Sequence, residues 1–186
     1  LHIAVCAALA NNNQNNVTIA VESPCYAPIV QSPQLFNHEV IKVRRLQPKE
    51  NFGHWRIDKQ QWLEAIKKSA ILMITPILNP SGWDYHDDDR EWIVRTCKKN
   101  DVIIIADEVY LDSKRRHSEY LPFYELGDHC ISINSLTKVY SLGTLRYGWI
   151  IASPDIAEQA RRAFRTLGGM MGSPTLRIAE SVFPEL

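Results

Sequence analysis

Seven side chains with chemically useful groups occur at or just after the ends of short apolar runs in the sequence. They provide an amine, a carboxylate, an amide, a hydroxyl, a guanidinium and two phenol rings, and they are Tyr26, Asn79, Asp107, Tyr110, Ser135, Lys138 and Arg146. A lysine amine can form an imine with an aldehyde. A poorly solvated carboxylate needs a cationic partner, which a protonated ring nitrogen provides. A guanidinium offers a planar, permanently charged fork that suits a phosphate group.

An aldehyde, a basic ring nitrogen and a phosphate group occur together in one cofactor, pyridoxal 5'-phosphate. We expect Lys138 to bind its aldehyde. We expect Asp107 to pair with its ring nitrogen, because a protonated pyridine is the better electron sink. Asn79 and Tyr110 could hydrogen-bond its phenolate oxygen. The sequence therefore predicts that these four side chains meet around one cofactor ring.

The other three side chains suit the remaining parts of the cofactor. Arg146 lies eight residues after Lys138 and could bind the phosphate together with Ser135. Tyr26 could cover a face of the ring. Each residue taken alone has a more ordinary explanation, as a surface charge, a cap or a packing residue at the core edge. Their joint order and spacing favour the cofactor site.

Short apolar runs alternate with helical patterns along the chain. Helices are predicted from about Asp58, from Asp87 to Lys99, and after Ser153. Nearly continuous apolar strands separated by helices predict an α/β fold, a mostly parallel sheet flanked by helices in three αβα layers. Ligands of such sheets bind outside the carboxyl ends of the strands. The predicted strands are 17–22, 39–44, 70–75, 101–107, 130–134 and 146–152.

Several motifs resemble those of the class I/II aminotransferases, which are fold-type-I pyridoxal-phosphate enzymes. NPSG at 79–82 matches the N-P-x-G turn of that family, and DEVY at 107–110 matches its D-x-x-Y element. SLTK at 135–138, followed by LRYGW at 145–149, matches its S-x-x-K … R-x-G element. ESPCY at 22–26 resembles the strand end where the family places its ring-stacking aromatic residue. The resemblance implies the same seven residue roles.

The resemblance also implies a domain organisation. Residues 1–175 would form the cofactor-binding large domain, incomplete at its N-terminus, and 176–186 would begin the segment leading to a missing C-terminal small domain. The phosphate loop and substrate-carboxylate arginine of the family lie in those missing parts, so we expect incomplete binding within this chain. Thr144 and Ser141 stand where the family usually or often has glycine.

The activity implied by the resemblance is that of a pyridoxal-phosphate-dependent transaminase. It would move an amino group between an amino acid and a 2-keto acid in a ping-pong cycle. Lys138 would form the internal aldimine and then act as general base and acid. A homodimer is implied, since the family builds each site from two subunits. Two alternatives stay open: a pyridoxal-phosphate-dependent carbon–sulfur lyase on the same scaffold, and an aminotransferase-like ligand-sensing domain of a transcription regulator.

Composition argues against other classes of function. The formal net charge is zero, which favours neither a nucleic-acid nor a membrane partner. The four cysteines lack zinc-ligand spacing, and the six histidines show none either, so no metal site is predicted. This cysteine usage fits a reduced, cytoplasmic setting. No apolar run reaches transmembrane length.

Overall fold

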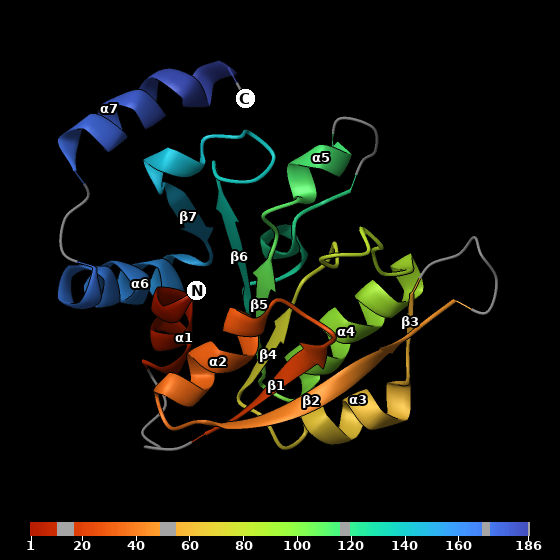
Figure 1. Cartoon of the computed structure of the whole chain (residues 1–186). Coiled ribbons are helices and arrows are strands. Elements are labelled where there is room, and N and C mark those ends of the chain that lie inside the picture. Colours follow the sequence, from red (N-terminus) through yellow and green to blue (C-terminus); the bar gives the residue numbers. More distant parts are fainter. Residues whose placement is uncertain (11–16, 49–54, 116–119, 169–171, 186) are drawn as a thin grey trace.

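The computed structural model describes residues 1–10, 17–48, 55–115, 120–168 and 172–185 (Figure 1). Within these ranges a seven-stranded sheet has the order β3-β2-β1-β4-β5-β6-β7. The five inner strands pair in parallel, whereas the edge strands β3 and β7 pair antiparallel with their neighbours. The strands are β1 (Thr18–Ser23), β2 (Glu39–Leu46), β3 (Arg56–Ile57), β4 (Ile71–Ile74), β5 (Ile103–Asp107), β6 (Cys130–Ser135) and β7 (Gly148–Ile151).

Helices cover both faces of the sheet and complete the three layers (Figure 1). One face packs against α3 and α4, and the other packs against α1, α2 and α6. The α-helices are α1 (His2–Leu9), α2 (Ala27–Leu35), α3 (Lys59–Ile66), α4 (Asp87–Lys99), α5 (Leu111–Arg115), α6 (Pro154–Leu167) and α7 (Ser173–Val182). Three 3₁₀ helices are η1 (Phe123–Leu126), η2 (Gly143–Leu145) and η3 (Phe183–Glu185).

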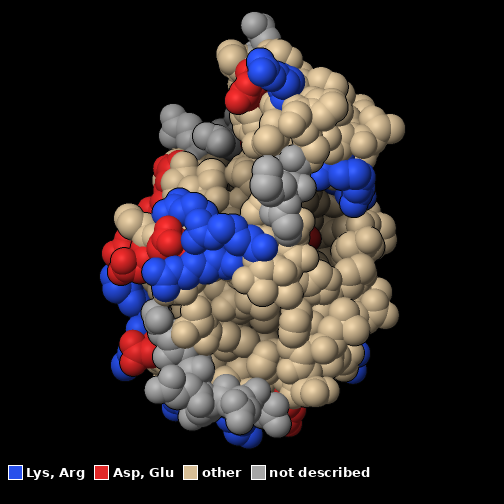
Figure 2. All heavy atoms as spheres, turned by 90° about the vertical axis from the view of Figure 1, so that its left-hand side faces the viewer, with Lys and Arg blue, Asp and Glu red and all other residues tan. Residues whose placement is uncertain are grey.

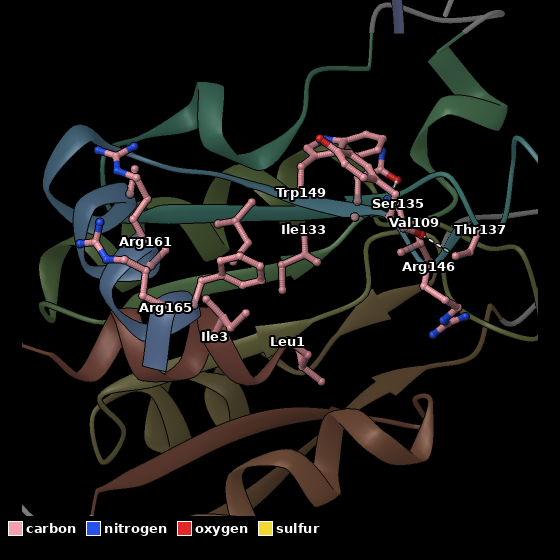
Figure 3. Close-up of a pocket in the computed structure, with 17 residues that line it drawn as sticks. Leu1, Ile3, Val109, Ile133, Ser135, Thr137, Arg146, Trp149, Arg161 and Arg165 are labelled. Atoms are coloured by element: carbon pink, nitrogen blue, oxygen red, sulfur yellow. Dashed lines mark hydrogen bonds between the residues drawn. The ribbon is translucent and has the colours of Figure 1, made fainter. Parts of the chain in front are cut away.

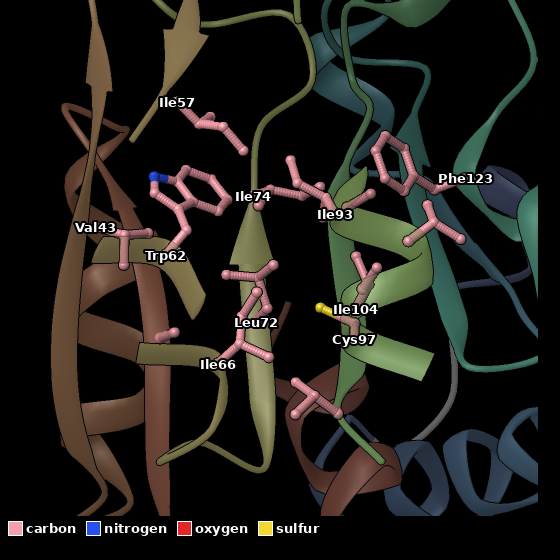
Figure 4. Close-up of a cluster of buried hydrophobic side chains, with 14 of the residues drawn as sticks. Val43, Ile57, Trp62, Ile66, Leu72, Ile74, Ile93, Cys97, Ile104 and Phe123 are labelled. Carbon is pink, nitrogen blue, oxygen red and sulfur yellow. The ribbon is translucent and has the colours of Figure 1, made fainter. Parts of the chain in front are cut away.

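Strand β4 contributes side chains to two hydrophobic cores, one on each face of the sheet. Successive side chains of a strand point to opposite faces. Leu72 and Ile74 pack with α3 and α4, whereas Ile71 and Met73 pack with α1 and α2. All four are buried, which explains a run without polar alternation. Figure 4 shows the core on the face covered by α3 and α4, where the sheet packs against Trp62, Ile66, Ile93 and Cys97.

The predicted fold class and all six predicted strands are confirmed, with bounds shifted by a few residues. The elements that were not predicted are the two-residue strand β3, the helices α2 and α5, and the 3₁₀ helices. Ser153 is the N-cap residue of α6 as expected, but its side chain makes no capping hydrogen bond. None of the described helices is long and apolar enough to cross a membrane.

The N-cap of α3 yields a stability prediction. Asp58 Oδ1 accepts hydrogen bonds from the backbone N–H of Gln60 at 3.1 Å and of Gln61 at 3.2 Å. Loss of these bonds in Asp58→Ala should lower the free energy of unfolding by about 1 kcal/mol, measured by urea titration. Asp58→Asn is the control, because an asparagine oxygen can still cap. Equal stability of the alanine variant and the parent would contradict this assignment.

Basic side chains gather around an acidic one on the side of the molecule where α6 lies (Figure 2). Arg161, Arg162 and Arg165 approach Glu158 at 2.9, 3.3 and 3.8 Å. These pairs are exposed, so each contributes little to stability. The patch is small and of mixed charge.

Candidate active site

Four parallel strands bring their carboxyl ends to one edge of the sheet, and the predicted side chains follow there. Asp107 and Ser135 are the last residues of β5 and β6. Tyr26 is the N-cap residue of α2, three residues after β1. Because β1, β4, β5 and β6 carry these segments in parallel, residues far apart in sequence converge.

A cavity of about 90 Å³ lies at this edge. Five of the seven predicted side chains share its wall: Tyr26, Asn79, Asp107, Tyr110 and Lys138. Thr75 and Val109 complete the lining. The structure therefore brings together the amine, the carboxylate, the amide and both phenol rings of the predicted set.

The two predicted phosphate ligands line a larger neighbouring cavity of about 710 Å³. Ser135, Thr137 and Arg146 lie near one another at one end of it (Figure 3). Val109 lines both cavities, so this end adjoins the smaller one. The Ser135 and Thr137 hydroxyl oxygens are 2.6 Å apart. Thr137 was not predicted, although its place inside the SLTK motif was a usable signal.

The other end of the larger cavity is mostly apolar. Leu1, Ile3 and Ile133 lie along it (Figure 3). Arg161 and Arg165 also line it, but their guanidinium groups point away from the Ser135 end (Figure 3). The charged and hydroxyl groups suited to a phosphate are therefore those at the end shared with the smaller cavity.

Asp107 is a carboxylate without a close cationic partner among the described residues. Its Oδ1 accepts a hydrogen bond from the Val109 N–H at 3.4 Å. Burial raises the pKa of Asp107, and the Val109 hydrogen bond and the positive charges of the Leu1 amino group and of Lys138 oppose this only partly. A protonated ring nitrogen beside Asp107 would supply the missing charge. The Thr75 hydroxyl is likewise buried with no hydrogen-bond partner in the described structure. These side chains fit pyridoxal phosphate.

Glu108, the next residue, does not line this cavity and was not predicted from the sequence. It is buried and accepts a hydrogen bond from the Phe123 N–H at 2.9 Å. Burial raises the pKa of Glu108 to about 7, although bonds from Ser132 and Phe123 oppose the shift. Glu108 occurs in an otherwise apolar region, and no sequence pattern indicated which groups it binds.

The raised pKa of Glu108 predicts a dependence of stability on pH. The folded protein keeps the Glu108 proton where the unfolded chain has lost it, so this residue's contribution falls as pH rises from about 4.5 to about 7. The total effect is roughly 3 kcal/mol. Urea unfolding at several pH values should show Glu108→Gln gaining stability relative to the parent over this interval. A difference that does not vary with pH would contradict the prediction.

A left-handed backbone occurs where the motif departs from its expected glycine. Ser141 has φ 58° and Arg146 has φ 52°. Glycine adopts this conformation without a steric penalty, which explains why a glycine is expected three residues after the lysine. Ser141 keeps the conformation without being glycine. Thr144 lies within η2, and no strain is recorded there.

Comparison with known proteins assigns this geometry to a family. A sequence model described as "Aminotransferase class I and II" matches residues 2–180. The chain belongs to the class I and II aminotransferase family. Among its relatives, histidinol-phosphate aminotransferase 2 of Idiomarina loihiensis is 24% identical over 172 residues, covering 92% of this chain and 46% of that protein. Methionine aminotransferase of Escherichia coli is 23% identical over 176 residues, covering 92% and 43%.

Solved structures share the fold of this aminotransferase-family chain. Cystalysin from Treponema denticola, which contains pyridoxal 5'-phosphate, matches with a TM-score of 0.83 and 20% identity, over 99% of this chain and 48% of that one. N-succinyldiaminopimelate aminotransferase from Mycobacterium tuberculosis matches with a TM-score of 0.80 and 19% identity, over 97% and 47%. The chain thus spans about half the length of the proteins it matches.

Proposed function

We propose that the protein is a pyridoxal-phosphate-dependent aminotransferase that moves an amino group between an amino acid and a 2-keto acid. The observation that carries the proposal is the meeting of Lys138, Asp107, Asn79, Tyr110 and Tyr26 at one cavity, in a chain of this family. When bound, the cofactor supplies an aldehyde for the amine and a ring that withdraws electrons from the reacting carbon.

Each residue has a role that follows from its chemistry and place. Lys138, which lines the cavity, would hold the cofactor through its amine and would move a proton at the substrate α-carbon. Asp107 holds a proton on the ring nitrogen. Asn79 and Tyr110 would bond the phenolate oxygen, and Tyr26, which is 55% exposed, would cover a face of the ring.

Phosphate binding is assigned to the shared end of the two cavities. Arg146 supplies the charge there. Ser135 and Thr137 supply hydroxyl groups that lie 2.6 Å apart. Val109 joins this end to the ring site.

The test of the reaction distinguishes amino-group transfer from an elimination reaction of the lyase type. The purified protein, loaded with pyridoxal phosphate, is incubated with single amino acids and 2-oxoglutarate, and new amino and keto acids are quantified. Formation of glutamate supports the proposal. Release of pyruvate and ammonia from a cysteine-type substrate, without glutamate, would favour the carbon–sulfur lyase alternative.

Assembly and location are also proposed. A cytoplasmic homodimer agrees with the family and with the four described cysteines, which form no disulfide. Light scattering of the purified protein tests the dimer. A DNA-binding helix-turn-helix domain upstream of residue 1 would instead support the regulator alternative. The domain boundary near residue 175 stays a prediction.

A further inference from the structure

A fully buried ion pair binds a residue that lines the smaller cavity. Glu22 ends the apolar part of β1, and Arg45 lies near the end of the neighbouring strand β2. Arg45 Nε donates to Glu22 Oε2 at 2.9 Å, and both side chains have no exposed surface. Such a pair costs desolvation energy and is weak evidence for stability in itself. The structural role of the pair is instead indicated by the groups to which it hydrogen-bonds.

Both groups of the pair bind the backbone of Thr75. The Thr75 N–H donates to Glu22 Oε1, and the Thr75 carbonyl oxygen accepts from Arg45 Nη2. Thr75 directly follows β4 and lines the cavity with Asn79 and Lys138. The ion pair thus fixes one residue of the cavity wall from both sides of its backbone.

The same pair also binds the far end of the loop that carries Asn79. The Tyr85 hydroxyl donates to Glu22 Oε2, and the Tyr85 ring lies 3.7 Å from Arg45 Cζ. Arg45 Nη1 donates to the carbonyl oxygen of Trp83 at 3.3 Å. The loop 75–85, which includes the NPSG turn, is therefore attached to the sheet at its beginning and its end.

We propose that the Glu22–Arg45–Tyr85 cluster is a positioning device for the cofactor site. It holds the loop that carries Thr75 and Asn79 in the geometry that binds the ring, without touching the cofactor itself. The inference rests on the proposed function, because it concerns the same cavity. A core of similar volume without these charges could keep the fold but would leave the Thr75 backbone unbound.

Two variants test the inference. Glu22→Leu/Arg45→Met removes both charges and every bond to Thr75, and Tyr85→Phe removes one hydroxyl and is the milder change. Asp89→Asn is the matched control. Asp89 is buried and accepts hydrogen bonds from Arg56 at 2.7 Å and from the Ile57 N–H at 3.3 Å, and it lines neither cavity.

Two readouts are compared across these proteins. Amide hydrogen exchange of residues 75–85 is measured without cofactor, and the dissociation constant for pyridoxal phosphate is measured by absorbance. The double variant should raise exchange of this loop at least about 10-fold and weaken cofactor binding at least about 10-fold. Tyr85→Phe should change both in the same direction by about 3-fold, and the control should stay within about twofold.

The outcomes separate this inference from the proposed function. Cofactor binding by the parent, with unchanged affinity in both cluster variants, would overturn the positioning role alone. So would increased exchange without weaker binding, since the cluster would then serve only the fold. If the double variant does not fold, the exchange and affinity of Tyr85→Phe decide whether the cluster has the positioning role. A parent that binds no pyridoxal phosphate would overturn the proposed function and this inference with it.

Discussion

Lys138→Ala is expected to lose covalent cofactor binding and to lower the turnover rate by at least about 10⁴-fold. Lys138 lines the same cavity as Asp107, and its positive charge acts on that carboxylate. Alanine can neither form the covalent link nor move a proton. The measurements are the visible absorbance of the protein with pyridoxal phosphate and the initial rate of glutamate formation.

Lys99→Ala is the control, because Lys99 is an exposed residue in the last turn of α4 and lines neither cavity. Its absorbance and rate should match those of the parent within about twofold. An alanine variant at position 138 that keeps the absorbance band or the rate would show that another residue carries the cofactor.

Asp107→Asn is expected to lower turnover by about 10²–10⁴-fold while the covalent link at Lys138 still forms. An amide has nearly the same shape as the carboxylate but carries no charge, so the protonated ring nitrogen loses its partner. Loss of one partner of a buried ion pair costs about 3–5 kcal/mol. If the ion pair persists in the transition state, losing it raises the activation free energy by this amount and lowers the turnover rate accordingly.

Asp107→Glu sharpens this test. The longer carboxylate keeps the charge and should recover part of the activity. Asp112→Asn is not a suitable control, because Asp112 accepts a hydrogen bond from Asn134 at 2.7 Å next to Ser135. Asp101→Asn is suitable, because Asp101 lies at the opposite end of β5. An Asp107→Asn variant with parental turnover would contradict the role given to the carboxylate.

The strands and the strand-end residues could be predicted because their signals are local. The run before Asp107 is apolar at each position, since β5 is buried on both faces. The helix α2 was missed because it contains Pro28 and Pro33 and lacks a clear apolar stripe. Strand β3 was missed because two residues carry no periodicity.

The polar residues beneath the site could not be predicted because their partners are far away in the sequence. Glu22 binds Arg45, Thr75 and Tyr85, and none of these bonds follows from local pattern. Glu108 has the same property, since it binds the backbone of Phe123. The sequence predicted which groups would contact a cofactor, and the structure adds the buried groups that bind the two ends of the loop 75–85.

We propose above all that this cavity is a covalent pyridoxal-phosphate site centred on Lys138. Borohydride reduction of the cofactor-loaded protein, followed by peptide mass spectrometry, tests it most directly. We expect the mass of one reduced cofactor on the peptide that contains Lys138 and on no other peptide. Modification of a different lysine, or none in protein shown to be folded, would contradict it.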